Sequence, residues 1–317
     1  MRPPLSVHAN GKILISGEYL VMKGATALAV PLKPGQELHL EETPETGVLR
    51  WEAYDTSGIW FSGSFSIPEP EVISSTDHAI ALRLVQLLKA AGKLNESYLC
   101  SEKGLKVITK LEFNRNWGFG SSSTLISLIA RWAGIQPLEL HRLVSKGSGY
   151  DVACSIAGSP VLFQLQNNLT RIDKVDFNPP FADSMFLVYL GNKQNSDPEV
   201  EKFRRHEGDF KHEIERISEV SLLLSREDNR STFIDLLTEH EAIMEGVLGR
   251  KAVKKDLFPD FEGAVKSLGA WGGDFVMAVT GSGFAYVKDY FKGKSLETIL
   301  PYSSIALKAD KKKITIG

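Results

Sequence analysis

A glycine-rich segment that runs into an apolar helix constrains this sequence most. Gly118-Phe-Gly-Ser-Ser-Ser-Thr124 combines two glycines with four hydroxyl side chains, and the apolar stretch 125–133 follows it directly. This pattern predicts a turn that leads into a buried helix. The first N–H groups of a helix lack partners within it and carry partial positive charge, so they can bind a phosphate. An ordinary helix N-cap explains the same residues, and this segment alone leaves both interpretations open.

The familiar motifs of nucleotide enzymes and hydrolases do not match. No Gly-Lys-Ser/Thr completes a Walker A loop, and Ser123 stands where a dinucleotide fingerprint has its third glycine. The protein-kinase signatures fail because a leucine follows His141-Arg142 and a valine follows Asp274-Phe275. There is also no Gly-x-Ser-x-Gly and no His-Glu-x-x-His in the chain. A phosphate site in this segment would therefore belong to a different class of protein.

Three further segments place polar residues beside glycine turns. Lys12 stands near the start of an apolar strand, and Glu18 follows that strand in a Gly-Glu turn. Asp151 follows the turn 147–149 at the start of a predicted helix, where a carboxylate could take a proton from a hydroxyl. Glycines in 269–273 precede a strand and permit close backbone approach to a ligand. Each segment also has a purely structural explanation. Lys12 and Glu18 could be exposed charges at strand ends, Asp151 could be a helix N-cap, and the glycines could form a helix C-cap.

Composition sets the class of protein. The chain has 317 residues, 43% hydrophobic and 24% charged, which is typical of one large or two modest globular domains. A net charge of −2 gives no reason to expect nucleic-acid or membrane binding. Cys100 and Cys154 are too few for a disulfide scaffold or a four-cysteine zinc site. No apolar run could span a bilayer and no signal peptide is evident, so we expect a cytoplasmic protein.

Local patterns predict two α+β domains, residues 1–167 and 168–317, divided in the polar connection 167–180. A hairpin is expected between 38–42 and 48–54 across the turn 44–47. The predicted strands are 12–16, 28–32, 38–42, 48–54, 58–67, 105–111, 161–166, 185–190, 275–280 and 284–287. The predicted helices are 77–91, 125–133, 137–145, 152–157, 198–224, 232–247 and 257–268.

The four segments follow one another along the chain in a particular order. In that order the sequence resembles the GHMP kinase superfamily, named for galactokinase, homoserine kinase, mevalonate kinase and phosphomevalonate kinase. Its first motif is similar to Asn10–Val21 with Gly24–Ala29, its second to Asn114–Ser123 and its third to Leu268–Asp274. Lys146-Gly-Ser-Gly-Tyr-Asp-Val-Ala-Cys154 most resembles phosphomevalonate kinases and short bacterial members with a Gly-Tyr-Asp-Ile-Ala segment. The resemblance covers most of the chain, from about residue 9 to residue 275.

This resemblance implies a two-domain fold and an activity. The N-terminal, ATP-binding domain would be a ribosomal-protein-like α/β domain with a left-handed βαβ unit, and the C-terminal domain would be ferredoxin-like α+β. The implied reaction uses ATP and Mg²⁺ to phosphorylate a mevalonate-pathway acceptor, either mevalonate or phosphomevalonate. A sugar or homoserine kinase, a related decarboxylase and a nucleotide-binding protein without turnover are the alternatives. A small-molecule acceptor is the expected partner, and a homodimer is one candidate assembly.

The resemblance also implies roles for individual residues. Asp151 would accept or orient the acceptor hydroxyl, and Lys12 would lie near it and the transferred phosphoryl group. The nucleotide would contact Gly118, Phe119, Gly120, Ser121, Ser122, Ser123, Gly269, Gly272 and Gly273, with Ser122 as the Mg²⁺ ligand. The acceptor would contact Glu18, Tyr19, Lys146, Ser148, Gly149, Lys193 and Ser196. The family's acidic metal ligand has no good counterpart, since Glu139 is poorly spaced from Asp151.

Three positions depart from the family pattern. Asn114 replaces a proline in the second motif, and Ser123 replaces an alanine. Trp271 replaces a glycine in the third motif, where a large ring could narrow the site or stack on a ligand. This last departure bears on the acceptor and keeps the non-catalytic alternative open.

Overall fold

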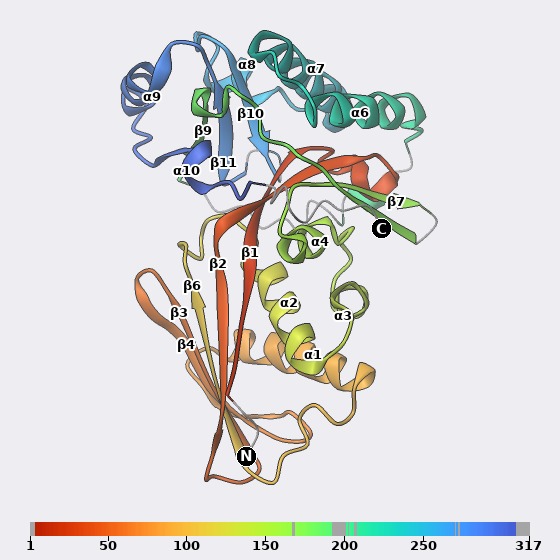
Figure 1. Cartoon of the computed structure of the whole chain (residues 1–317), viewed down its shortest axis with the longest axis vertical. Helices are drawn as coiled ribbons and strands as arrows, with labels where there is room; N and C mark the ends of the chain where they lie inside the picture. The colour runs from red at the N-terminus through yellow and green to blue at the C-terminus, as the bar shows by residue number, and fades with distance from the viewer. Residues whose placement is uncertain are drawn as a thin grey trace. The chain divides into compact units, whose positions relative to one another are not determined.

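The chain forms two compact units that share two long strands. The computed structural model describes residues 4–166, 169–191, 201, 203–205, 208–269, 271 and 273–308. Unit 1 comprises the chain up to Gly11 with Pro34–Arg115 and Phe119–Ile156, and unit 2 comprises Lys12–Lys33, Asn116–Gly118 and the chain from Ala157 onward. The paired strands β1 (Leu5–Ser16) and β2 (Ala27–Thr43) contribute residues to both (Figure 1). This division differs from the predicted boundary after residue 167.

Unit 1 combines a mixed sheet with helices. Its strands run in the order β5-β4-β3-β6-β2, with β3 and β6 parallel and the other neighbours antiparallel. These strands are β3 (Val48–Asp55), β4 (Gly58–Ser66), β5 (Val72–Ser75) and β6 (Gly104–Leu111). The helices are α1 (His78–Leu94), α2 (Ser121–Ala133), α3 (Pro137–Val144) and α4 (Tyr150–Ala157).

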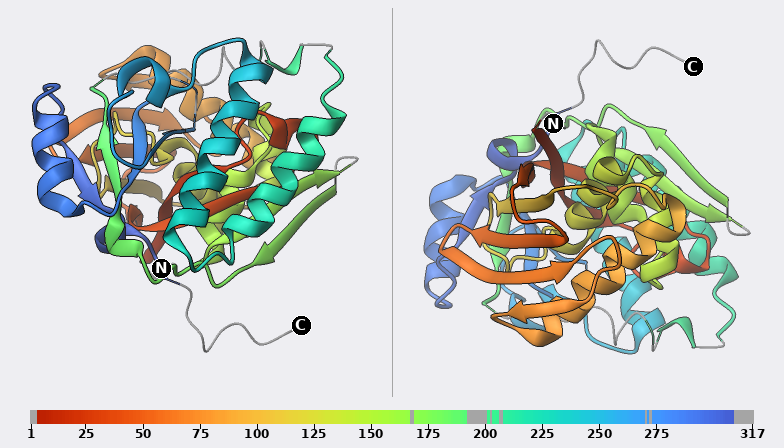
Figure 2. Two further views of the ribbon diagram at one scale, coloured as in Figure 1. Left: turned by 90° about the horizontal axis from the view of Figure 1, so that it is seen from above. Right: turned by 90° about the horizontal axis from the view of Figure 1, so that it is seen from below.

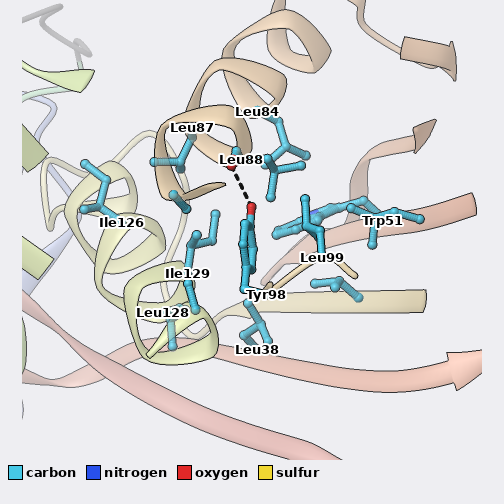
Figure 3. Packing of buried hydrophobic residues seen from close by; sticks show 14 of the residues in the cluster. Leu38, Trp51, Leu84, Leu87, Leu88, Tyr98, Leu99, Ile126, Leu128 and Ile129 are labelled. Carbon is cyan, nitrogen blue, oxygen red and sulfur yellow. Dashed lines mark hydrogen bonds between the residues drawn. The ribbon is translucent and has the colours of Figure 1, made fainter. Parts of the chain in front are cut away.

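The core of unit 1 lies between the sheet and these helices (Figure 3). Trp51 from β3 packs in the same cluster as Leu84 from α1 and Ile129 from α2. The buried Tyr98 donates its hydroxyl hydrogen to the Leu88 carbonyl at 2.7 Å, so its one polar group is satisfied. This packing buries the middle and C-terminal turns of α2 against the core of unit 1.

Unit 2 contains a second, four-stranded sheet in the antiparallel order β10-β11-β9-β12. Beside it, β7 pairs with β2 at Ala27–Ala29 and with β8. The strands are β7 (Val161–Gln166), β8 (Leu169–Lys174), β9 (Met185–Tyr189), β10 (Ala264–Leu268), β11 (Phe275–Val279) and β12 (Ile299–Pro301).

The helices of unit 2 include a long pair, α6 and α7, that lie alongside one another (Figure 2). They are α6 (Lys211–Leu224), α7 (Arg230–Leu248), α8 (Val253–Leu257), α9 (Gly283–Lys292) and α10 (Tyr302–Ile305), with short 3-10 turns at Leu20–Lys23 and Ala182–Ser184. Across the described parts of both units, none of the helices has the length and apolarity needed to cross a bilayer.

The predicted hairpin between 38–42 and 48–54 is wrong. β2 pairs with β6, while β3 pairs with β4 and β6. The stretches 28–32 and 38–42 also belong to one strand, β2, which Pro34-Gly35 does not end. The Gly35 N–H donates to the Glu112 carboxylate at 2.7 Å, so a side chain supplies the partner at this interruption.

Two C-terminal predictions exchange helix and strand. The predicted helix 257–268 contains the strand β10, and the predicted strand 284–287 lies in helix α9. β8 lies in a segment predicted to be a connection. Short apolar runs do not distinguish a helix from a strand, and here long-range pairing decides. In this sheet β11 lies between β10 and β9, and the segment that follows it forms helix α9.

Candidate active site

The predicted site residues divide between the two units. Unit 1 holds the segments Phe119–Ser123 and Lys146–Asp151. Unit 2 holds Lys12, Glu18, Tyr19, Gly118, Gly269 and Gly273. Lys193, Ser196 and Gly272 lie outside the described residues.

In unit 1 the glycine-rich segment forms the start of α2. Gly120 caps the helix with a left-handed φ of 93°, and no side chain caps the first turn. The first intrahelical bond runs from Thr124 N–H to the Gly120 carbonyl at 2.9 Å, so the N–H groups before it have no partner within the helix. This arrangement fits a bound phosphate.

The side chains of this segment differ in their exposure. Ser122 is exposed, whereas Ser123 is buried and donates to the Gly120 carbonyl at 2.9 Å. Phe119 is also buried and packs edge-to-face on Phe113, with the ring centroids 5.7 Å apart. Of these side chains, Ser122 is therefore the most accessible to a metal-bound nucleotide, while Phe119 anchors the turn.

Asp151 lies in the first turn of α4, beside His141 of α3. Its Oδ1 accepts a hydrogen bond from Val152 N–H at 3.0 Å. Gly149, with a φ of 87°, passes over the histidine ring so closely that a Cβ there would lie 3.2 Å from His141 Nδ1. Burial lowers the pKa of His141, and the charge of Asp151 opposes that shift. A neutral imidazole therefore accompanies the candidate base, a partner that sequence reasoning did not identify.

The neighbouring predicted residues lie on the surface of the same loop. Lys146 is exposed, and Ser148 Oγ accepts from Tyr150 N–H at 3.4 Å. Glu139 is exposed in the first turn of α3. Within the described ranges, no group of three or more His, Cys, Asp or Glu side chains could hold a metal ion.

In unit 2 the three motif segments converge on Gly118. Lys12 Nζ donates to the Gly118 carbonyl at 3.0 Å. A Cβ added to Gly118 would overlap Asp274 Oδ2 and lie 3.2 Å from Asp274 Cγ. The Asp274 carbonyl in turn accepts from Leu190 N–H at 2.8 Å. A cation from the first motif and a carboxylate from the third thus both contact one residue of the second.

Aromatic contacts hold Trp117, the residue before Gly118, against the four-stranded sheet of unit 2. Trp117 packs edge-to-face on Phe275, with centroids 5.6 Å apart, and also contacts Tyr189 at 6.4 Å. Burial raises the pKa of Tyr189, and the negative charge of Asp274 adds to this. Trp117 and Asp274 lie in the second and third motifs, and no local pattern predicts a role for them because their proximity depends on the tertiary fold.

Glu18, Tyr19 and Trp271 lie in the interior of unit 2. Glu18 forms an ion pair with Lys266, and the Tyr19 hydroxyl accepts a hydrogen bond from Trp271 N–H at 3.0 Å. The Trp271 indole donates to the Lys251 carbonyl at 3.2 Å. The predictions that Glu18 and Tyr19 contact an acceptor, and that Trp271 stacks on a ligand, are disfavoured by this burial.

Of the third-motif glycines, Gly269 has a left-handed φ of 73° with open space beside it.

Comparison with known proteins gives a match in structure only. No protein-family model matches the chain, and no curated protein matches it in sequence. A mevalonate kinase from Methanococcus jannaschii is 18% identical with a TM-score of 0.67, over 98% of this chain and 100% of the other. A Streptococcus pneumoniae phosphomevalonate kinase, solved with phosphomevalonate and AMPPNP, is 14% identical with a TM-score of 0.66, over 96% and 98%.

A third structure widens the range of substrates associated with this fold. A Lactococcus lactis galactokinase, complexed with galactose, is 13% identical with a TM-score of 0.61, over 97% of this chain and 94% of the other. At such identities the similarity concerns the fold and not the acceptor. The large sheet, the second sheet and the near-complete coverage agree with the resemblance seen in the motifs, and this chain has the two-domain fold of the GHMP kinases.

Proposed function

We propose that this protein is an ATP-dependent small-molecule kinase that phosphorylates mevalonate or phosphomevalonate. The observation that carries the proposal is the convergence of Lys12, Gly118 and Asp274, one residue from each of three motifs, within a fold shared with such kinases. The Lys146–Cys154 segment supports a mevalonate-pathway acceptor by its resemblance to phosphomevalonate kinases.

The nucleotide phosphates would bind along the glycine-rich segment. The uncapped N–H groups at the start of α2 supply donors, and the Lys12 ammonium beside Gly118 supplies positive charge. Mg²⁺ carried by the nucleotide would neutralise phosphate charge, and the exposed Ser122 is the side chain we assign to it.

Phosphoryl transfer would then depend on positioning and charge neutralisation. An acceptor oxygen forms a bond to the γ-phosphorus while the bond from that phosphorus to the β–γ bridging oxygen breaks, and ADP leaves with the electron pair. If the acceptor is a hydroxyl, its proton passes to the Asp151 carboxylate. If the acceptor is a phosphate, no proton need be removed, and Asp151 would orient the nucleophile.

A sugar kinase is the second candidate. The observation in its favour is that a galactokinase and a Bacteroides heptose 1-phosphate kinase have the same fold over nearly the full chain. Asp151 and Lys12 are both present, which argues against a relative that only binds nucleotide.

The test is ADP release from MgATP with mevalonate, phosphomevalonate, galactose and homoserine as separate acceptors. Turnover with one of the first two, lost in Asp151→Ala, is the expected result. Circular dichroism and AMPPNP binding establish that the variant is folded and still binds nucleotide. Turnover only with galactose or homoserine would replace the proposed acceptor. A wild-type protein that does not bind AMPPNP would refute the kinase assignment.

A further inference from the structure

Four ionisable side chains form a buried cluster in unit 2. Glu18, His240, Lys266 and Glu241 are 2%, 0%, 0% and 4% exposed. They come from the turn after β1, from α7 and from β10. Lys266 Nζ donates to Glu18 Oε1 and to the Ser267 carbonyl, and it lies 4.0 Å from Glu241 Oε1. We call these four residues the Glu18 cluster.

Stability alone does not account for the Glu18 cluster. Burying charges is costly, and apolar residues of similar volume are often at least as stabilising. Within the described parts of the chain, His240 Nδ1 and Ser267 Oγ have no hydrogen-bond partner, and Glu18 Oε2 lies 3.1 Å from His240 Nε2, which already accepts from Gly17 N–H. Each unsatisfied group adds a desolvation cost. Because burial of these groups costs free energy, we infer that the cluster serves to fix a particular local geometry.

The geometry that it fixes is the turn Gly17-Glu18-Tyr19. Gly17 N–H donates to His240 Nε2 at 3.0 Å, and Lys266 holds the Glu18 side chain. Leu20 N–H donates to the Glu18 carbonyl at 2.5 Å, which closes a γ-turn around Tyr19. Tyr19 has φ 57° and ψ −51°, a strained conformation for a residue with a side chain. Such strain persists only where the surroundings impose it, and the bonds from His240 and Lys266 fix the two residues that precede Tyr19.

The strained turn contacts the third motif at Trp271. The Tyr19 hydroxyl accepts from Trp271 N–H, and both side chains are buried in one apolar cluster. Three residues after Trp271, Asp274 lies against Gly118 of the glycine-rich segment. Contacts within unit 2 therefore link the Glu18 cluster to Trp271, and Asp274 of the same motif contacts Gly118 at the predicted nucleotide site.

We propose that Lys266 and His240 are positioning residues for nucleotide binding: they hold Glu18 and the strained Tyr19 turn, which sets the third-motif loop through Trp271. This inference rests on the proposed kinase function. It predicts that changes in the Glu18 cluster or in the Tyr19 hydroxyl alter the KM for ATP and leave the KM for the acceptor unchanged.

Two variants test the path at its two ends. Tyr19→Phe removes only the hydroxyl that receives Trp271 N–H. The double variant Glu18→Gln/Lys266→Met removes both charges together, because Lys266→Met alone would leave a buried carboxylate unpaired. Lys255→Met is the matched control, since it removes an ion pair with Glu245 at 2.5 Å on the exposed side of α7 and α8. Each protein is measured for thermal unfolding, for AMPPNP affinity and for kinetics.

The expected result is AMPPNP binding weakened about tenfold in both variants and unchanged in Lys255→Met, as residues that act through others typically do. If the double variant does not fold, Tyr19→Phe alone decides. Folded variants that bind AMPPNP as tightly as wild type would overturn the inference and leave the kinase assignment standing. A wild-type protein that does not bind AMPPNP would overturn both.

Discussion

The Asp274 side chain lies against the Cα of Gly118, so closely that a methyl group on residue 118 would overlap the carboxylate. Gly118 does not have a left-handed φ, so an alanine is compatible with its backbone. The requirement for glycine at this position therefore comes from the approach of Asp274, and the two residues should be coupled energetically.

Gly118→Ala tests this coupling. We expect at least a tenfold loss in kcat/KM for ATP, because the carboxylate or the glycine-rich segment must shift, and small misplacements in a catalytic site are costly. The measurement is a double-mutant cycle with Asp274→Ala. The double variant should bind AMPPNP more tightly than Gly118→Ala alone, since it lacks the overlapping group. Strictly additive losses would show that the contact is unimportant.

Lys12→Met removes the ammonium that bonds the Gly118 carbonyl. We expect kcat to fall about 100-fold, as for other preorganised groups that stabilise transition-state charge. The melting temperature should change by no more than about 2 °C, because the lysine is only half-buried. Steady-state kinetics and a thermal melt measure both quantities.

Lys33→Met is the control for Lys12→Met. Lys33 likewise donates to backbone carbonyls, those of Ser303 and Ser304 at 3.3 and 2.9 Å. We expect this variant to keep wild-type kcat. An equal loss in both variants would mean that Lys12 acts only on the structure.

Glu241→Gln should stabilise the protein at alkaline pH. Burial raises the pKa of Glu241 from 4.5 to about 7, and the charge of Glu18 adds to the shift while Lys266 opposes it. Between pH 4.5 and about pH 7 the folded chain keeps a proton on Glu241 that the unfolded chain has lost, so the free energy of unfolding falls as pH rises. The loss is complete above pH 7 and amounts to at most about 3 kcal/mol. Glutamine cannot ionise and avoids the loss.

Urea unfolding at pH 4.5 and pH 8 measures this effect. The gain of Glu241→Gln over wild type should be larger at pH 8 than at pH 4.5. Glu245→Gln, on a more exposed part of the same helix, is the matched control. A gain of equal size at both pH values would contradict the titration of Glu241 as its cause.

His141→Asn should reduce the loss of stability in mild acid. Burial lowers the pKa of His141, the charge of Asp151 opposes this shift, and the neighbouring Arg142 reinforces it. As pH falls below 6.5, the unfolded chain takes up a proton at this residue before the folded chain does, so wild-type stability decreases. Asparagine cannot take up this proton, so the variant lacks this contribution to the loss of stability. Unfolding free energies at pH 7.5 and 5.5 give the comparison, with the exposed His78→Asn as control. Parallel curves for wild type and His141→Asn would refute the prediction.

The sequence by itself determined the parts of this protein that depend on neighbouring residues. Helix α1 begins after Asp77, whose side chain accepts from Ala79 and Ile80 N–H at 3.0 and 3.1 Å, as its apolar spacing and position predict. The glycine-rich turn before α2 follows from the same local logic. The order of the motifs was enough to indicate the two-domain fold, because each motif is a short contiguous stretch.

Only the tertiary structure decided which elements pair and which motif residues meet. Strand β10 was predicted as a helix, since five buried residues carry no reliable period, and this error hid Lys266 inside an apparent helix. Glu18 and Lys266 are 248 positions apart, so no local pattern could link them. The same holds for Lys12 and Asp274, which both contact Gly118. Burial and proximity arise from strand pairing and packing across the chain, and these physical effects decide whether a charged residue lines a site or holds it in place.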